Sequence, residues 1–535
     1  MALMEQNQAL LPEDLLYKSG LDRIEEAVVS SHFMHRFCND SGLESYDLSE
    51  FETRSRYISL TAVFDILLPT LLSASREFCH ARLAEIKARA RQNYTEYGLS
   101  SPGDVEAADF MAEVMFDRNY SKDAARHCSR QLLSSQIAQR IQAGLPIRMV
   151  IPALPFKISS PLKSRGARPD LAEVNFLLLL YEVALTVELL YKEARPDIPG
   201  RLAEFAVVSD GSRFSALVGE SESVVRDYRE RILRWSEWLG IADFVRVYDY
   251  KALLSERLLP QVQQQKLRIS QAAVADYAQV MWPLFDPLRA AASLRLAARI
   301  EPDPERENPE GRFGALLKSL VYTIQYKSLR REGRPALWEH RRLYRELTGH
   351  IFEPYVAISS EEIPGVLQEI EAGGVLSDSA KEYLRQSMLK EAWEATILYL
   401  AEIKSDRELQ EEPISSCLPA HIRWTIHAKR GQIAIAVPTA LGLSVQAWAG
   451  AAVFKRVKRG KIKLCTLPVL ALEGAKAIPV RVQDSEGVLG LGDQPLFYLY
   501  PDIGYPDVGQ PDRGRQDITA FLAALVTSLT RRKVT

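Results

Sequence analysis

Residues 147–173 read IRMVIPALPFKISSPLKSRGARPDLAE, and this stretch decides the fold. Its first part, 147–151, is short and mostly apolar and lies between two prolines, which is typical of a buried strand. Pro169 then opens a long apolar stretch that predicts a helix to about Lys192. A second apolar run, 205–208, predicts another strand. A strand, a helix and a strand in this order form the unit of a parallel sheet.

The length of the chain predicts more than one structural part, because 535 residues exceed what a single hydrophobic core usually holds. Helical spacing runs from 15 to about 142 and is broken by a turn-rich stretch at 97–104. We therefore expect a helical N-terminal extension at 1–103. An α/β catalytic core is expected at 104–350. A C-terminal α/β part, 351–535, is expected to complete the sheet and the active site.

The C-terminal part carries several predicted strands. Residues 422–427 and 432–437 predict two adjacent strands, and 428–431 between them contain the glycine that favours a hairpin turn. Shorter strands are expected at 453–455 and 462–464, which would extend the sheet. The predicted fold class is α/β, with a Rossmann-like mixed sheet flanked by helices and a helical N-terminal extension.

The chain has 67 basic and 69 acidic residues, and its net charge is -2. This balance excludes a strong electrostatic field over the whole protein that would attract nucleic acid or an anionic membrane. The basic run 455–461 lacks interleaved aromatic residues, so a solvated hairpin tip is favoured over nucleic-acid binding. The first residues show no basic segment followed by an apolar one, and apolar runs such as 176–181 are too short to span a bilayer. We expect a cytoplasmic protein with no nucleic-acid or membrane partner.

The five cysteines are scattered and form no CxxC pair, which predicts reduced thiols and no disulfide. His32, His35 and Cys38 follow helical spacing, but no further ligand cluster accompanies them. They are interpreted as ordinary helix residues, and no metal site is expected.

The densest group of cations follows the first predicted strand and consists of Lys157, Lys163, Arg165 and Arg168. These residues lie between the carboxyl end of that strand and the start of a helix, where free backbone N–H groups and the helix dipole favour an anion. The group predicts a site for a phosphate or a carboxylate. A solvated basic loop is the alternative, and spacing alone does not decide between the two.

The second predicted strand ends at Ser209 and Asp210. Ligands of open α/β sheets lie outside the carboxyl ends of the strands, so Asp210 stands where an acid, a base or a substrate-orienting carboxylate is expected. An aspartate that merely caps a helix or forms a turn is the alternative.

The predicted strand at 422–427 has a polar face. Alternation places Arg423, Thr425 and His427 on one side and apolar residues on the other. If the polar side lines a cleft, it offers a guanidinium for an anion and an imidazole that transfers protons near neutral pH. A solvent-facing side of a strand is the alternative.

These clusters contain a series of motifs in a fixed order. They are LPFK at 154–157, P-x-K at 161–163, G-x-x-PD-x-AE at 166–173, SDG-x-x-F at 209–214, a helical tyrosine at Tyr228 and I-R-x-x-I-H at 422–427. In this order the motifs resemble the isonitrile synthase family, also described as the pyoverdine/dityrosine biosynthesis family. The similarity covers about 145–235 and, more weakly, about 380–500.

The resemblance implies a Rossmann-like enzyme of secondary metabolism. Such an enzyme converts the amino group of an amino acid, usually tyrosine or tryptophan, into an isonitrile with ribulose 5-phosphate as carbon donor. It implies no metal and no nicotinamide cofactor, and an oxygenase acting downstream is a candidate partner. The implied catalytic residues are Lys157, Glu173, Asp210 and His427. The implied substrate-binding residues are Lys163, Arg165, Arg168, Asp170, Ser209, Phe214, Tyr228, Arg423 and Trp448.

The sequence departs from the family pattern at one element. Where the family usually has Pro-Trp-His, this chain reads Ala447-Trp448-Ala449, so the tryptophan is kept and the histidine is missing. A methyl group neither donates nor accepts a proton. The alternative is therefore a diverged member that binds a phosphorylated or acidic metabolite and catalyses a different or partial reaction.

Overall fold

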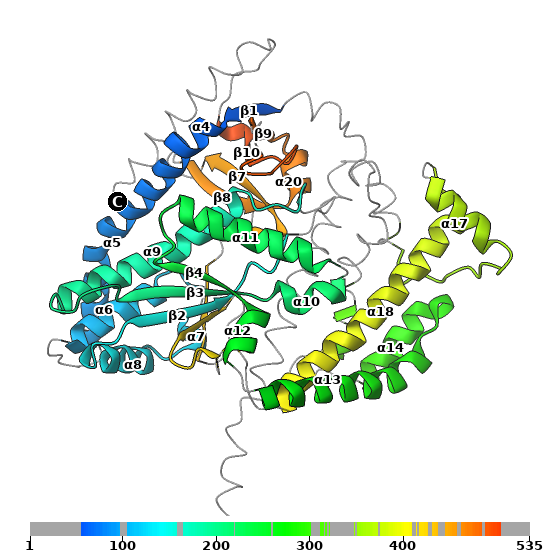
Figure 1. The fold of residues 1–535 in the computed structure, drawn as a ribbon, viewed down its shortest axis with the longest axis horizontal. Helices are drawn as coiled ribbons and strands as arrows, with labels where there is room; N and C mark the ends of the chain where they lie inside the picture. Colours follow the sequence, from blue (N-terminus) through cyan, green and yellow to red (C-terminus); the bar gives the residue numbers. More distant parts are fainter. Residues whose placement is uncertain are drawn as a thin grey trace, which may run out of the picture. The chain divides into compact units, whose positions relative to one another are not determined.

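A computed structural model describes most residues between 55 and 503, and Figure 1 shows the fold. The described residues are 55–96, 104–122, 124–157, 164–218, 220–257, 260–300, 311–314, 316–317, 320, 347, 350–372, 375–408, 414, 417–425, 431–436, 445–456, 462–483 and 487–503. The predictions for His32, His35, Cys38, Lys163 and His427 lie outside them.

The chain forms two compact units that are interleaved along the sequence. The sheet unit contains the described parts of Ser45–Arg213, Ser223–Leu253 and Leu418–Thr535. The helical unit contains the described parts of Phe214–Glu222 and Leu254–Cys417. This division differs from the three consecutive parts expected from the sequence, because the chain leaves the sheet unit and returns to it.

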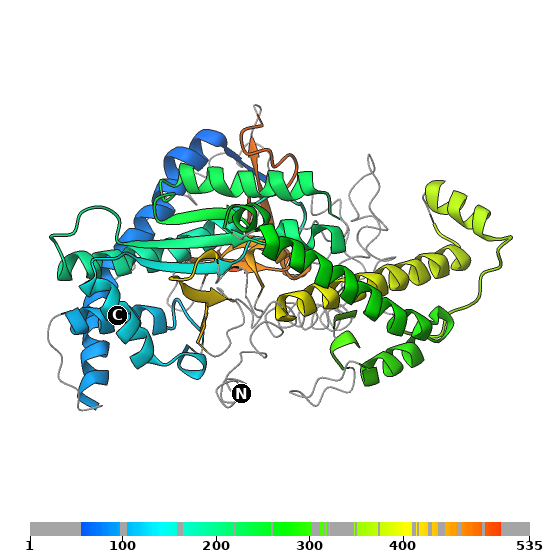
Figure 2. The same cartoon turned by 60° about the horizontal axis from the view of Figure 1, so that its bottom comes forward.

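The first sheet of the sheet unit has the strand order β4-β3-β2-β5-β6, and all its neighbouring pairs are parallel. Its strands are β2 (Ile147–Pro152), β3 (Ala203–Ser209), β4 (Val245–Asp249), β5 (Ile422–Thr425) and β6 (Ile433–Ala434). In Figure 1 and, from another angle, Figure 2, β2, β3 and β4 run side by side. The carboxyl ends of the five strands therefore share one edge.

The second sheet has the order β1-β9-β10-β7-β8 and is mixed. Its strands are β1 (Arg56–Ser59), β7 (Ala451–Arg456), β8 (Ile462–Leu467), β9 (Ile478–Gln483) and β10 (Phe497–Leu499). The pairs β1–β9 and β7–β10 are parallel, whereas β9–β10 and β7–β8 are antiparallel.

Helix α9 (Leu171–Ala194) lies at the centre of the sheet unit. It contacts β3 and β4 of the first sheet, β7 and β8 of the second, and the helices α5 and α6. The helix is long and apolar enough to cross a membrane, but 83% of its most apolar 18-residue segment is buried inside the protein. A helix that packs on several sides is apolar all round, so α9 is a core helix.

The remaining helices of the sheet unit are α4 (Leu60–Ala62), η3 (Val63–Leu67), α5 (Leu68–Glu96), α6 (Asp104–Phe116), α7 (Ala124–His127), α8 (Arg130–Gln142), η7 (Ala447–Ala449), α20 (Val469–Gly474) and η9 (Pro501–Ile503). Helices α10 (Gly211–Val218), α11 (Glu222–Trp238) and α12 (Tyr250–Arg257) lie where the chain passes between the units.

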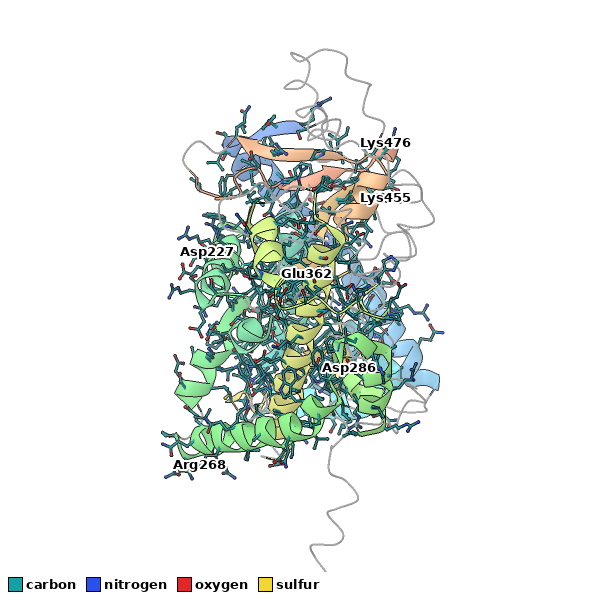
Figure 3. All side chains as sticks on the ribbon, turned by 90° about the vertical axis from the view of Figure 1, so that its right-hand side faces the viewer. Asp227, Arg268, Asp286, Glu362, Lys455 and Lys476 are labelled. Atoms are coloured by element: carbon teal, nitrogen blue, oxygen red, sulfur yellow. The ribbon has the colours of Figure 1, made fainter. Side chains whose placement is uncertain are left out.

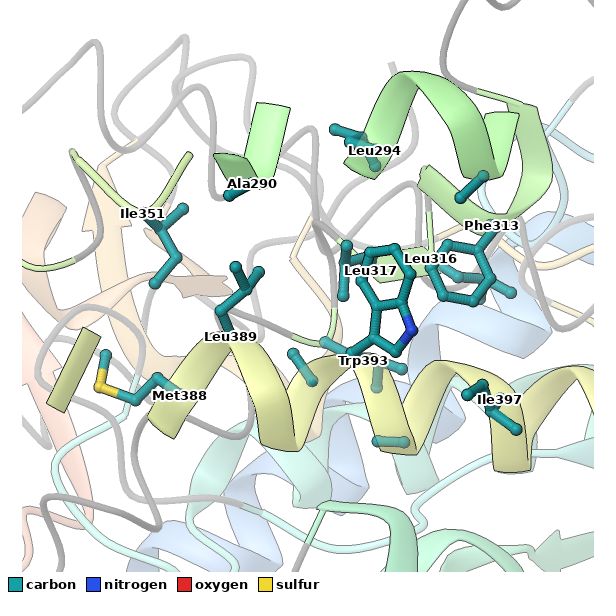
Figure 4. Close-up of a cluster of buried hydrophobic side chains, with 14 of the residues drawn as sticks. Ala290, Leu294, Phe313, Leu316, Leu317, Ile351, Met388, Leu389, Trp393 and Ile397 are labelled. Atoms are coloured by element: carbon teal, nitrogen blue, oxygen red, sulfur yellow. The ribbon is translucent and has the colours of Figure 1, made fainter. Parts of the chain in front are cut away.

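The helical unit has its own hydrophobic core around the fully buried Trp393 (Figure 4). The Phe313 ring lies 4.6 Å from Trp393 and the Phe285 ring 5.3 Å, measured between ring centroids. Its elements are α13 (Pro260–Met281), η4 (Trp282–Leu284), η5 (Pro287–Arg289), α14 (Ala290–Ile300), α17 (Ile363–Ala372) and α18 (Asp378–Glu408).

The structure confirms the predicted α/β class and the strand, helix and strand at 147–151, 169–192 and 205–208. The hairpin predicted between 422–427 and 432–437 is wrong, because β5 and β6 are neighbours but run parallel. The strands predicted at 453–455 and 462–464 exist, yet they belong to the second sheet and do not extend the first.

Candidate active site

The loops that follow β2 and β3 lie directly against each other. The Ser209 hydroxyl donates a hydrogen bond of 2.8 Å to the carbonyl of Leu154, whose φ of 53° is in the left-handed region. A Cβ atom on Gly211 would lie only 1.9 Å from the Pro155 carbonyl oxygen. Asp210, between Ser209 and Gly211, is buried. The glycine therefore permits the close approach that brings Asp210 to the loop carrying Lys157.

Strand β2 marks the point where the order of the first sheet reverses. The chain proceeds from β2 outward to β3 and β4, whereas β5 adds to the other side of β2, with Val150 opposite Arg423. Ligands of open α/β sheets bind at such a switch point, outside the carboxyl ends of the strands. The loop after β2 is therefore the expected place for a substrate.

That loop ends in a buried polar network around Lys157. The Lys157 ammonium lies 2.9 Å from Asp170 Oδ2 and 2.9 Å from Glu173 Oε2, and none of the Lys157 side chain is exposed. The Tyr228 hydroxyl on α11 donates a hydrogen bond of 3.0 Å to Glu173 Oε1. One cation and two carboxylates thus share a site from which water is excluded, where electrostatic interactions are strong.

Asp170 and Glu173 also form a capping box at the start of α9. Asp170 Oδ1 accepts the N–H of Ala172 at 2.7 Å, and Glu173 Oε2 accepts the N–H of Asp170 at 2.9 Å. The N–H of Leu171 donates to the Leu496 carbonyl. Protein acceptors therefore occupy the N–H groups of Asp170, Leu171 and Ala172, so these three donors do not bind a phosphate.

Burial sets the protonation of the network. Burial, reinforced by the negative charge of Asp170 and opposed by Lys157, raises the pKa of Glu173 to about 8. Burial likewise raises the pKa of Asp170 above its usual value, against the charge of Lys157. Burial alone would lower the pKa of Lys157, but the two carboxylates outweigh it and raise that pKa. The network thus holds a charged lysine beside a Glu173 that exchanges a proton near neutral pH.

We expect Glu173→Gln to flatten the pH dependence of stability between about pH 5 and 8. The folded pKa of Glu173 is about 8 against an ordinary value of 4.5, so the folded protein binds more protons than the unfolded one in this window. The free energy of unfolding of the wild type should therefore fall as pH rises, and an amide removes this contribution.

Urea unfolding at several pH values measures this difference. Glu193→Gln is the matched control, since Glu193 lies on the same helix with 60% of its side chain exposed. Parallel curves for the wild type and Glu173→Gln would show that the Glu173 carboxyl does not titrate in this window.

The predicted basic loop has its charges compensated within the protein at two positions. Lys157 is enclosed by Asp170 and Glu173, and the Arg168 guanidinium pairs with Asp227 on α11. Arg165 is half-buried in the same loop. A fully buried ammonium requires counterions, which is why Lys157 does not face an external anion.

Residues 137–308 match the family model described as pyoverdine/dityrosine biosynthesis protein. The resemblance predicted from the motifs is confirmed over this segment. An L-tyrosine isonitrile synthase from Pseudomonas aeruginosa is 34% identical over 110 residues, which cover 21% of this chain and 31% of that enzyme. An L-tyrosine isonitrile synthase from Xenorhabdus nematophila is 33% identical over 92 residues, covering 17% and 25%. The alignments thus span less than a third of either relative.

A solved structure also resembles the chain. The crystal structure of the PvcA protein from Pseudomonas aeruginosa aligns with a TM-score of 0.41 and 18% sequence identity, over 73% of this chain and all of that chain.

The segment that matches the pyoverdine/dityrosine family contains Lys157, Asp170, Glu173, Asp210 and Tyr228. The predicted residues outside that segment are Arg423, His427 and Trp448.

The structure describes the surroundings of two of these predicted residues, Trp448 and Arg423. Trp448 packs edge to face on Phe176 of α9, with 5.8 Å between ring centroids. Arg423 is half-buried on β5, while its neighbours Trp424 and Thr425 are both buried. The predicted alternation of one buried and one open face on β5 therefore fails at Thr425, because both faces are covered at this end of the strand, as is usual in a parallel sheet. Only the backbone of Phe214 is described.

Sequence reasoning missed a set of polar residues from the second sheet and its connections. They are Glu473, Arg481, Gln494 and Tyr498, and all are buried. Burial raises the pKa of Tyr498, with Arg165 opposing the shift and Glu473 reinforcing it. These side chains thus lie within electrostatic reach of the loop after β2. Their positions in the sequence give no signal, since they lie in α20, β9, the connection between β9 and β10, and β10, and share no motif.

Proposed function

We propose that this chain is an isonitrile synthase-like enzyme of natural-product biosynthesis. It converts the amino group of an amino acid to an isonitrile, with ribulose 5-phosphate as carbon donor. The observation that supports this most directly is the buried network of Lys157, Asp170, Glu173 and Tyr228 after β2, within the segment that matches the family. A cytoplasmic location and an oxygenase that acts on the product belong to the same proposal.

The proposed chemistry needs proton transfer at several steps. An amine that condenses with a ketone to form an imine must lose protons, and the departing oxygen must gain them to leave as water. Glu173 suits this role, because burial raises its pKa to about 8 and it holds a proton near neutral pH. Tyr228, hydrogen-bonded to Glu173 Oε1, extends the path for that proton. The Lys157 ammonium supplies the positive charge of the network and holds the carboxyl groups of Asp170 and Glu173 in place through its two ion pairs.

The remaining roles in the proposal fall to residues that the sequence motifs single out. Asp210 is proposed as a second acid or base, together with His427. Lys163 and Arg165 are proposed to bind the phosphate, and Arg423 the carboxylate of the amino acid, because ammonium and guanidinium groups form charge-assisted hydrogen bonds with these anions. Arg168 supports the phosphate site through the loop that it shares with Arg165.

A second candidate function is favoured by the element around Trp448. Alanine follows this tryptophan where the related pattern has a histidine, so one proton-transferring group is missing. A diverged enzyme that accepts a different amino acid, or stops at an earlier intermediate, fits this replacement.

Mass spectrometry of the purified protein with ribulose 5-phosphate and single amino acids tests the two candidates. An isonitrile formed from tyrosine or tryptophan supports the first function and opposes an altered reaction. Product from a non-aromatic amino acid alone, or an accumulated imine, supports the second. Consumption of neither substrate with any amino acid contradicts both.

Asp210→Asn and His427→Ala are each expected to lower turnover by about 10² to 10⁴-fold, the usual contribution of a positioned acid or base. Both variants should keep the wild-type melting temperature, which separates a chemical role from a structural one. The measurement is the rate of product formation at saturating substrates. Unchanged rates in both variants would exclude Asp210 and His427 as catalytic acids or bases.

A further inference from the structure

The connection between β9 and β10 holds the loop after β2 through one glutamine. Gln494 donates from Nε2 to the carbonyl of Arg168 at 2.7 Å, and its Oε1 accepts the N–H of the same residue at 3.0 Å. Gln494 is only 7% exposed. Its amide therefore satisfies both backbone groups of Arg168, as a neighbouring strand would.

Gly166 makes room for this contact. A Cβ atom built on Gly166 would lie 1.8 Å from Oε1 and 2.4 Å from Cδ of Gln494. The Ser164 hydroxyl also donates to the Gly166 carbonyl at 2.9 Å. Since Gln494 is fixed by two hydrogen bonds, any larger residue at Gly166 would have to displace it. The glycine of the predicted G-x-x-PD motif thus has a packing partner 328 positions further along the chain.

The same connection is anchored on α11. Arg231 donates from Nη1 to the Leu489 carbonyl at 2.7 Å, and Gly490, with a φ of 58°, leaves no space for a Cβ beside that guanidinium. Arg231 also bonds to Asp227, the carboxylate that pairs with Arg168. Figure 3 labels Asp227 on its helix. Residues 489–494 are therefore fixed at one end to α11 and at the other to the loop of Arg168.

We propose that Gln494 is a positioning residue that fixes the loop of Arg165 and Arg168 for a sugar phosphate. The identity of the ligand rests on the proposed function, whereas the two hydrogen bonds between Gln494 and Arg168 are independent of it. Gln494 lies outside the segment that matches the family, in the connection between β9 and β10 of the second sheet. A loop held at both backbone groups of one residue loses less freedom when it binds an anion, which favours affinity.

Hydrogen exchange of the full chain tests the positioning without reference to a ligand. Gln494→Ala should increase exchange in peptides covering 164–170, because the Arg168 N–H loses its acceptor. Gln494→Glu should give an intermediate result, since a carboxylate still accepts that N–H but cannot donate to the carbonyl. Gln483→Ala, an exposed glutamine at the end of β9, is the matched control. Equal exchange in all four proteins would overturn the proposal.

The Gly166–Gln494 contact gives a second test. Gly166→Ala should increase exchange in the same peptides, because the added methyl group displaces Gln494. In the Gln494→Ala background the same substitution should add little, since the obstructing side chain is gone. Fully additive effects would show that the two residues act independently, against the proposal.

Binding of ribulose 5-phosphate, measured by calorimetry, connects the contact to function. Gln494→Ala should weaken binding about tenfold, which corresponds to about 1.4 kcal/mol, whereas Gln483→Ala should bind like the wild type. In turnover the KM for the sugar phosphate should rise more than kcat falls. Wild-type affinity in Gln494→Ala overturns the inference. Absence of binding to the wild type overturns the proposed function, and hydrogen exchange then still decides whether Gln494 holds the loop.

Discussion

Lys157→Met is expected to lower the free energy of unfolding by about 3–5 kcal/mol and to abolish turnover, because it leaves two buried carboxylates without their cation. Lys157 has no exposed surface, and each of its two ion pairs measures 2.9 Å. Water cannot replace the ammonium at such a position, so Asp170 must take up a proton and Glu173 keep its own, or the start of α9 must open. Chemical unfolding and product formation measure the two effects.

Two further variants make this expectation specific. Lys87→Met removes an ion pair with Glu193, whose side chain is 60% exposed, and should change stability by less than about 1 kcal/mol. Above pH 8, where Glu173 of the wild type is ionised, Lys157→Met combined with Glu173→Gln should be more stable than Lys157→Met alone, since the group beside Asp170 then no longer titrates. A Lys157→Met protein as stable as Lys87→Met would exclude the buried ion network.

Gly211→Ala is expected to destabilise the protein by about 1–3 kcal/mol, the usual range for overpacking, and to remove most turnover. The new methyl group would overlap the Pro155 carbonyl oxygen and approach the Phe156 ring. Backbone atoms cannot rotate away as a side chain can, so the loops after β2 and β3 must separate. Separation moves Asp210 away from the loop of Lys157. Thermal unfolding and turnover measure the two effects.

Gly365→Ala is the matched control for this substitution. Gly365 lies in α17, and a Cβ there meets nothing within 4 Å. Alanine in a helix should stabilise the protein by roughly 0.5–1 kcal/mol relative to glycine. If Gly211→Ala behaves like Gly365→Ala, the two loops do not need their close approach.

The sequence by itself determined the local elements around the site. The strand at 147–151, the helix from Pro169 and the strand at 205–208 follow from apolar runs bounded by proline and turn residues, which are local signals. The order of short motifs also predicted the family that residues 137–308 match. These features depend on residues close together in the chain, so one sequence suffices to predict them.

The tertiary structure alone decided how distant segments meet. The parallel pairing of β5 with β6 was not predictable from the glycine between them, because register and direction depend on neighbours such as β2. The sequence predicted that Lys157 belongs to a group of cations that binds a phosphate. The structure shows that its ammonium pairs with the carboxylates of Asp170 and Glu173 instead.

Gln494 is the clearest case of a contact that the sequence alone could not predict. It contacts Arg168, 326 positions earlier in the chain, and no local pattern marks it. Pairing across such a separation follows from the packing of the second sheet beside α9, where the backbone groups of the loop need partners. Local propensity therefore set the strands, helices and motif spacing of this protein, whereas long-range packing decided which charges are buried and which residues support the site.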